Sequence, residues 1–138
     1  MNAAMHTFHF LKNKMQKLNK HECEKFLGSN FVSAQMGISS IHLNFITSAD
    51  EDLGVTVMCP FFIKLDNLIK VGNGEDPATI SFLYELIGKT VSIFQQDIDF
   101  SLQIDFENIG CLRIDRRSDG FESYLVNIPG DTGGIAVF

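Results

Sequence analysis

The sequence contains no tryptophan and only two tyrosines among its 138 residues. Thirteen phenylalanines supply nearly all of the aromatic surface, which predicts a core filled with rings that carry no polar group. Long apolar runs are also missing. No stretch approaches the ~20 apolar residues that cross a bilayer, and residues 1–20 lack the apolar segment of a secretory signal. We therefore expect a cytoplasmic protein that makes no membrane contact.

Cysteine is scarce as well. Cys23, Cys59 and Cys111 are odd in number and far apart, which argues against a disulfide framework and favours free thiols in a reducing compartment. Hydrophobic residues make up 45% and charged residues 20% of the chain, as in ordinary folded proteins. A chain of this length fits one domain, and we predict that residues 1–138 form it.

The net charge of −6 is unevenly distributed. Residues 1–25 carry five lysines and two glutamates, whereas residues 26–138 carry six basic and fifteen acidic side chains. The body of the protein is therefore strongly acidic, and such a field repels nucleic acid and anionic lipid but attracts basic partners. The alternative is that the charge serves only solubility.

The spacing of apolar residues changes along the chain. Helical spacing over residues 4–18 predicts an N-terminal helix that ends at Asn19 or Lys20. Alternation predicts strands at residues 41–45 and 55–57, with a polar loop between them. The apolar stretch at residues 61–71 is predicted to be a strand, or a strand plus a helical turn. Gly72-Asn73-Gly74 is expected to break it.

A second helix is predicted to follow. Asp76 can cap its start and Pro77 suits the first helical position. Its buried side should carry Ile80, Leu83 and Ile87, and Gly88 can close it. Alternation then returns and predicts four strands, at residues 91–93, 102–106, 112–114 and 124–128, and a last one at residues 135–138.

The two β regions match one another. Phe26-Leu27-Gly28 corresponds to Leu86-Ile87-Gly88, and residues 40–45 correspond to residues 101–106. Half-buried strands all look alike, so coincidence is the alternative, but the matched glycines favour duplication. We predict an α+β fold of two related β-rich halves with about four antiparallel strands each. The first repeat covers residues 26–71, and a helix plus the second repeat covers residues 76–138.

Catalytic motifs are absent from the sequence. None of the four histidines lies in a glycine-rich elbow beside a serine, and His21 with Cys23 forms no known signature. His6 and His9 lie one turn apart, but no C-x-x-C or H-E-x-x-H pattern completes a metal site. The glycine pairs lack a phosphate-binding motif, and Arg116-Arg117 is flanked by acidic residues, so we expect no cofactor and no direct nucleic-acid binding.

Seven acidic residues are the candidates for a binding surface. They lie in the polar loop of the first half and around one hairpin of the second: Asp50, Glu51, Asp52, Asp97, Asp99, Asp105 and Glu107. Carboxylate pairs perform acid–base chemistry only within a cleft, whereas residues alternating with Ile98 and Phe106 form a solvent-facing row. We therefore predict a binding role, with plain solvation as the alternative for each residue.

The second repeat also carries a family resemblance. Its segments Leu86-Ile87-Gly88-Lys89, 102–108, Leu112-Arg113-Ile114 and Phe121-Glu122-Ser123-Tyr124 resemble the small bacterial immunity proteins of contact-dependent growth inhibition and related toxin systems. The resemblance covers roughly residues 26–128. A departure is the turn after Phe106, where Asn108-Ile109-Gly110 replaces the expected tight Asn-Gly.

The resemblance implies a cytoplasmic protein that binds the C-terminal toxin domain delivered by a neighbouring cell and blocks its active site. Such toxins are commonly nucleases, which present cations to phosphates, so an acidic inhibitor can imitate their substrate. Two sheets with helices are also similar to the Whirly domains, so a single-stranded nucleic-acid-binding module is the alternative. That function needs a basic groove with exposed aromatic rings. A third possibility is a hydrolase, but the sequence shows no pattern of a nucleophile with its base.

Overall fold

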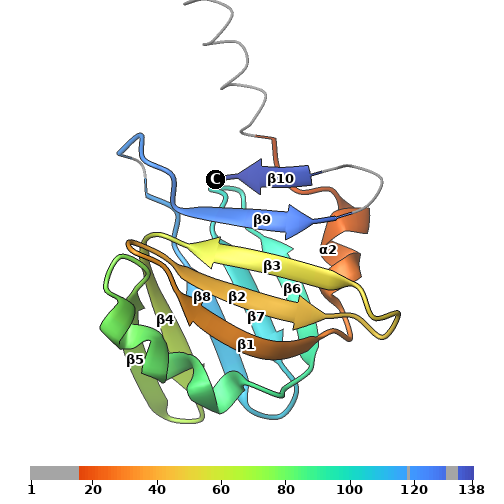
Figure 1. Cartoon of the computed structure of the whole chain (residues 1–138), viewed down its shortest axis with the longest axis horizontal. Coiled ribbons are helices and arrows are strands. Elements are labelled where there is room, and N and C mark those ends of the chain that lie inside the picture. Colours follow the sequence, from red (N-terminus) through yellow and green to blue (C-terminus); the bar gives the residue numbers. More distant parts are fainter. Residues whose placement is uncertain (1–15, 118, 130–133) are drawn as a thin grey trace, which may run out of the picture.

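The computed structural model describes residues 16–117, 119–129 and 134–138. Two antiparallel five-stranded sheets pack face to face, and their strands cross (Figure 1). The first sheet, sheet A, has the order β1-β2-β3-β9-β10, and the second, sheet B, has the order β5-β4-β8-β7-β6. The predicted α+β fold of two β-rich halves is confirmed, with five strands in each half instead of about four.

The strand bounds follow chain order. The first half contains β1 (Asn30–Met36), β2 (Ile41–Ile46), β3 (Asp52–Val57), β4 (Pro60–Leu65) and β5 (Leu68–Asn73). The second half contains β6 (Val91–Gln96), β7 (Leu102–Phe106), β8 (Gly110–Ile114), β9 (Tyr124–Ile128) and β10 (Gly134–Val137). Gly72 and Asn73 therefore continue β5 rather than break it, because both pair with β4.

Helical segments precede each half. The helix α2 (Lys20–Phe26) begins at Asn19, whose side chain accepts a hydrogen bond from the Glu22 N–H. The predicted N-terminal helix lies mostly outside the described residues, and its predicted end is wrong, because residues 16–18 are not helical and Asn19 starts a helix. The cause is local: the Asn19 and Glu22 side chains each bond the other's backbone N–H.

The segment η1 (Pro77–Leu86) begins at Asp76 as predicted, but it is a 3₁₀ helix. Its buried residues are Ile80, Leu83 and Leu86, which share one side at three residues per turn. Leu86 thus takes the buried place predicted for Ile87. In Figure 1, η1 lies where the edges of β1 and β5 meet, and α2 lies beside β6.

The two halves repeat one arrangement. Each starts with a helical segment, continues as a three-stranded meander in one sheet, and sends its last two strands to the opposite sheet. Gly28 and Gly88 have positive φ angles of 79° and 87° at equivalent places. Their N–H groups donate reciprocally, Gly28 to the carbonyl of Val91 at 2.9 Å and Gly88 to the carbonyl of Phe31 at 2.6 Å.

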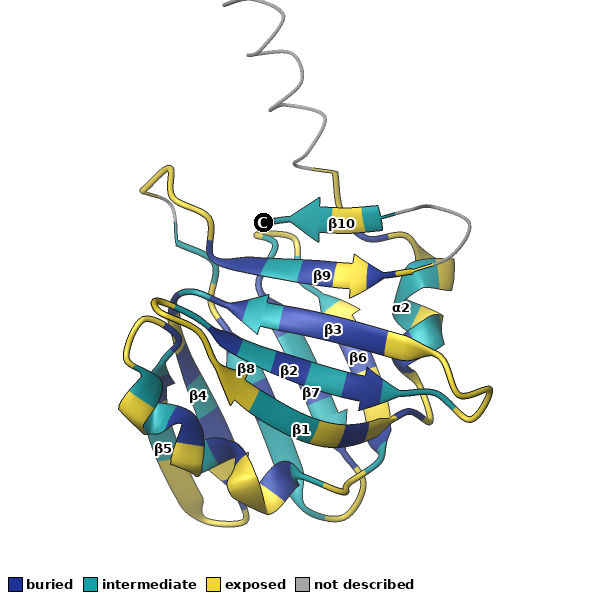
Figure 2. Cartoon of the chain, viewed as in Figure 1, coloured by how far each residue is buried: buried dark blue, intermediate teal, exposed yellow. Residues whose placement is uncertain are grey.

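One hydrophobic core lies between the sheets, and the strands alternate between buried and less buried residues (Figure 2). Phenylalanines occupy its centre, as the composition predicts. Phe26 stacks on Phe94 with ring centroids 3.9 Å apart, and Phe31 lies 5.2 Å from Phe45 and 5.9 Å from Phe106. Because these rings come from both halves, the core joins the two repeats.

Candidate functional site

The seven predicted acidic residues lie in two separate places. Asp50, Glu51 and Asp52 are exposed at the β2–β3 turn of sheet A, where Asp50 has a φ of 65°. The other four belong to β7 and to the turns on either side of it, in sheet B. The structure therefore does not bring all seven side chains onto one sheet.

Two of the four acidic residues on sheet B are engaged in local structure. The guanidinium of Arg113 donates from Nη2 to Asp97 Oδ2 at 2.5 Å and from Nε to Asp115 Oδ1 at 2.8 Å. Asp99 Oδ1 accepts a hydrogen bond from the Ser101 N–H at 3.1 Å, which lowers the pKa of Asp99. Both carboxylates thus help to hold the segment between β6 and β7.

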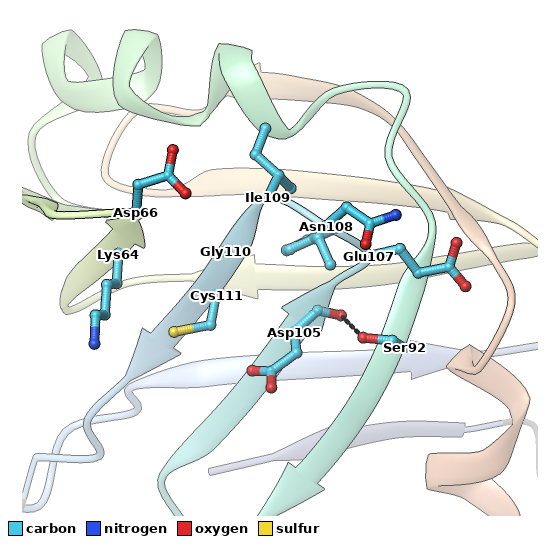
Figure 3. A pocket seen from close by; sticks show the side chains of 10 residues that line it. Lys64, Asp66, Ser92, Asp105, Glu107, Asn108, Ile109, Gly110 and Cys111 are labelled. Atoms are coloured by element: carbon cyan, nitrogen blue, oxygen red, sulfur yellow. Dashed lines mark hydrogen bonds between the residues drawn. The ribbon is translucent and has the colours of Figure 1, made fainter.

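Asp105 and Glu107 line an open pocket of about 400 Å³ on the outer side of sheet B. Figure 3 shows Asp66 and Lys64 at one side, Cys111 between Lys64 and Asp105, and Glu107 at the opposite side. Asp66 was not among the predicted site residues. Its sequence setting could have revealed it, because Asp66-Asn67 separates two apolar runs as a two-residue hairpin turn does.

Backbone geometry brings the two turns of this pocket together. Gly110 pairs with Leu65 across β8 and β4. A Cβ atom at position 110 would collide with the carbonyl oxygen of Lys64, so only glycine permits this approach. Asp66 and Asn108, at the tips of the two turns, have φ angles of 51° and 60°, a region that Asp and Asn tolerate better than most residues.

Four cations of the described residues are paired with carboxylates: Lys20, Lys70, Arg113 and Arg117. Arg117 donates from Nη1 to Glu75 Oε1 at 2.6 Å, and Lys70 Nζ lies 3.2 Å from Glu85 Oε1. Within the described part of the chain, some carboxylates make neither an ion pair nor a hydrogen bond: Asp50, Glu51, Asp52, Asp66, Glu107 and Glu122. The unpaired negative charge is therefore concentrated at the β2–β3 turn and at the sheet B pocket.

The cysteines are poor nucleophiles. All three are free. Burial raises the pKa of the Cys59 thiol to about 11, and burial also raises the pKa of Cys111 in the pocket. A protonated thiol is neither a strong nucleophile nor a metal ligand.

One hydroxyl–imidazole pair was not predicted from the sequence. His42 Nδ1 lies 2.6 Å from Thr56 Oγ1 across β2 and β3, on the outer face of sheet A. No carboxylate of the described residues bonds the other ring nitrogen, which faces Gly54. Because nothing orients the imidazole as a base, the pair is best explained as a cross-strand link.

Other surfaces offer little chemistry. A second open depression of about 430 Å³ surrounds Arg117, Glu75 and Phe121, but Arg117 is held there by Glu75 and by the carbonyl of Met58 at 3.1 Å. Across the described ranges, no group of three or more histidine, cysteine or acidic side chains could hold a metal ion. In the same ranges, no helix is long and apolar enough to span a membrane.

The fold is thus a two-layer β-sandwich whose halves exchange strands between the sheets. Comparisons with protein-family models, with curated proteins and with solved structures found no match. The resemblances to immunity proteins and to Whirly domains therefore stay predictions.

Proposed function

We propose that this chain is a cytoplasmic immunity protein that binds a cationic toxin domain, such as a nuclease, and blocks it without performing catalysis itself. The observation that carries the proposal is the distribution of unpaired charge. Arg113 and Arg117 are each occupied by carboxylates, whereas six of the seven predicted acidic residues, all but Asp97, form no ion pair within the described part of the chain.

This arrangement suits a protein that imitates the charge of a nucleic acid. Unpaired carboxylates at two exposed turns create a negative field that steers a cationic domain and accelerates its association. Arginines engaged by carboxylates are poorly placed to bind phosphates, which argues against the nucleic-acid-binding alternative.

The test starts from the neighbouring genes: a toxin domain encoded there is co-expressed with this chain, and the purified pair is titrated by calorimetry. We expect protection from growth arrest and a nanomolar dissociation constant. Raising the salt from about 50 to about 300 mM should weaken binding by roughly tenfold or more, because the contact is electrostatic. The purified chain should show no hydrolytic activity of its own.

Several outcomes would count against the proposal. These are a cognate partner that is neutral or acidic, binding that is indifferent to salt, or a lack of protection despite good expression of both proteins. Retention of single-stranded DNA or RNA in a gel-shift assay at low salt would favour the alternative function.

A further inference from the structure

We infer that the outer face of sheet B, from the edge strand β5 to β7, is the docking surface for a cationic partner protein. This "sheet B face" comprises the outward side chains of β4, β5, β7 and β8 together with the two turns of the pocket. The inference deepens the proposed function, on which the identity of the partner as a toxin rests.

Strand register assembles the face from two rows of neighbouring side chains. One row runs Ile69, Lys64, Cys111, Asp105, and the next runs Val71, Phe62, Arg113, Gln103. The residues that alternate with them, such as Ile63 and Leu112, are buried in the core. Both rows therefore point away from the sandwich, and neither α2 nor η1 packs against β4, β7 or β8 as it does against β6 or β5.

The charge of the face specifies the sign of the partner's charge. Asp66, Asp105 and Glu107 surround the pocket, and Lys64 is its only cation among the described residues. Within the described part of the chain, the carboxylates of Glu107 and Asp66 have no hydrogen-bond or ion-pair partner, and the carboxylate of Asp105 accepts only from the neutral amide of Gln103, at 3.0 Å. Arg113 is compensated by two carboxylates. The face as a whole is negative, so a basic surface is its electrostatic complement.

Apolar side chains at β5 supply the second component of an interface. Ile69 is 61% exposed and Val71 is 68% exposed, beside the half-buried ring of Phe62. Exposed aliphatic side chains beside polar ones are typical of the desolvated centre and polar rim of a protein–protein contact. β5 is also an edge strand of sheet B, so a partner can reach this strip without displacing another strand.

The outer face of sheet A lacks this combination. Its polar side chains bond one another, as His42 does with Thr56 and as Asn44 does when its Nδ2 donates to Ser33 Oγ at 2.9 Å. Among the described residues, the only charged residue in the strands of sheet A is Asp52, the first residue of β3. The exposed apolar side chain of Ile135 lies on the edge strand β10, which β9 separates from β3 and its unpaired carboxylate Asp52.

The test uses the full chain and two synthetic octapeptides, one of alternating lysine and valine and one of alternating lysine and serine. Amide chemical shifts are followed by NMR during titration at low salt. We expect shift changes confined to β4, β5, β7 and β8 and to the two turns of the pocket. Because valine side chains can be buried on the β5 strip, the lysine–valine peptide should bind about tenfold more tightly.

The repeat provides a matched control. Ile69→Ser on β5 should abolish most of the difference between the peptides, whereas Ile135→Ser, at a residue 63% exposed on the equivalent edge strand β10, should leave it unchanged. Removing charge by Asp66→Asn and Glu107→Gln should weaken binding of both peptides more than Asp50→Asn and Glu51→Gln do.

Other results would overturn the inference. These are shift changes centred on the β2–β3 turn or on sheet A, no binding by the lysine–valine peptide, or equal effects of the two serine variants. A dimer seen by light scattering that Ile69→Ser dissolves would identify a second copy as the occupant and overturn it too. None of these measurements uses a toxin. The proposed function has a separate test, in which a lack of protection in cells would refute it.

Discussion

At the scale of single residues, close backbone approach explains why certain positions carry no side chain. Gly74 follows β5, and a Cβ atom there would collide with the carbonyl of Val57. Gly74 also donates its N–H to the carbonyl of Cys59 at 2.9 Å. The contact joins the end of β5 to the connection between β3 and β4. Because both sides of the contact are backbone, a side chain at position 74 could fit only if the backbone moved.

Gly74→Ala should therefore destabilise the protein by about 1–3 kcal/mol, the usual cost of forcing extra atoms into a packed site. The free energy of unfolding is measured by urea denaturation. Gly37→Ala is the control, because the atom nearest its Cβ is the hydroxyl of Ser40, which can rotate away. Equal losses in the two variants would contradict this account.

The buried thiol of Cys59 predicts a dependence of stability on pH. Burial raises its folded-state pKa from near 9 to about 11, so the folded protein holds this proton more tightly than the unfolded chain. The resulting stability is fully present below pH 9 and is lost as the pH rises from 9 to 11, by up to about 2 kcal/mol.

Urea denaturation of the wild type and of Cys59→Ala between pH 8 and 11 measures this effect. We expect the difference in stability between the two proteins to shrink as the pH rises. Cys23→Ala, at a half-buried position, should change the dependence of the unfolding free energy on pH less than Cys59→Ala does. A constant difference across the range would show that Cys59 does not titrate with folding.

At the scale of elements, the helical segments end in the same way in both halves. Gly28 and Gly88 have φ angles of 79° and 87°, and no atom lies within 4 Å of a Cβ built on either. The cost of a side chain at these places is therefore purely conformational. Alanine at either position should lower stability by roughly 1–2 kcal/mol, and the two losses should be similar.

Lys89→Ala is the control for this pair, because Lys89 is exposed and surface substitutions usually change stability by less than about 0.5 kcal/mol. Chemical denaturation of all three variants decides the outcome. If only one glycine variant is destabilised, the two helical ends are not equivalent in energy, although they are equivalent in geometry.

At the scale of the whole molecule, neither sheet can form from one half alone. β9 pairs with β3, and β4 pairs with β8, so each sheet contains strands from both repeats. The core phenylalanines are likewise contributed by both. The sandwich should therefore unfold as one cooperative unit.

We expect a single urea transition that coincides when followed by far-UV circular dichroism and by tyrosine fluorescence, since Tyr124 is buried in the core. Residues 1–75 and 76–138 expressed separately should each give a collapsed amide NMR spectrum, and mixing them should restore the dispersed spectrum. Two separate transitions, or one fragment that folds alone, would refute this.

The sequence by itself determined the features that depend on neighbours along the chain. Alternation located the strands at residues 41–45 and 102–106, and Asp76-Pro77 located the start of η1. These succeed because side-chain alternation and end-capping are local properties. The end predicted at Asn19 or Lys20 was wrong for the same local reason, since the bond from the Glu22 N–H to the Asn19 side chain makes this place the start of a helix.

Only the tertiary structure decided which strands meet and which charges stay unpaired. Asp97 and Asp105 look alike in the sequence, yet Asp97 is bound by Arg113 from another strand and Asp105 is left at the edge of the pocket. Asp66 joins that pocket because β4 pairs with β8, forty-five positions along the chain from Leu65 to Gly110. Such pairings depend on how the whole core packs, which no local pattern encodes.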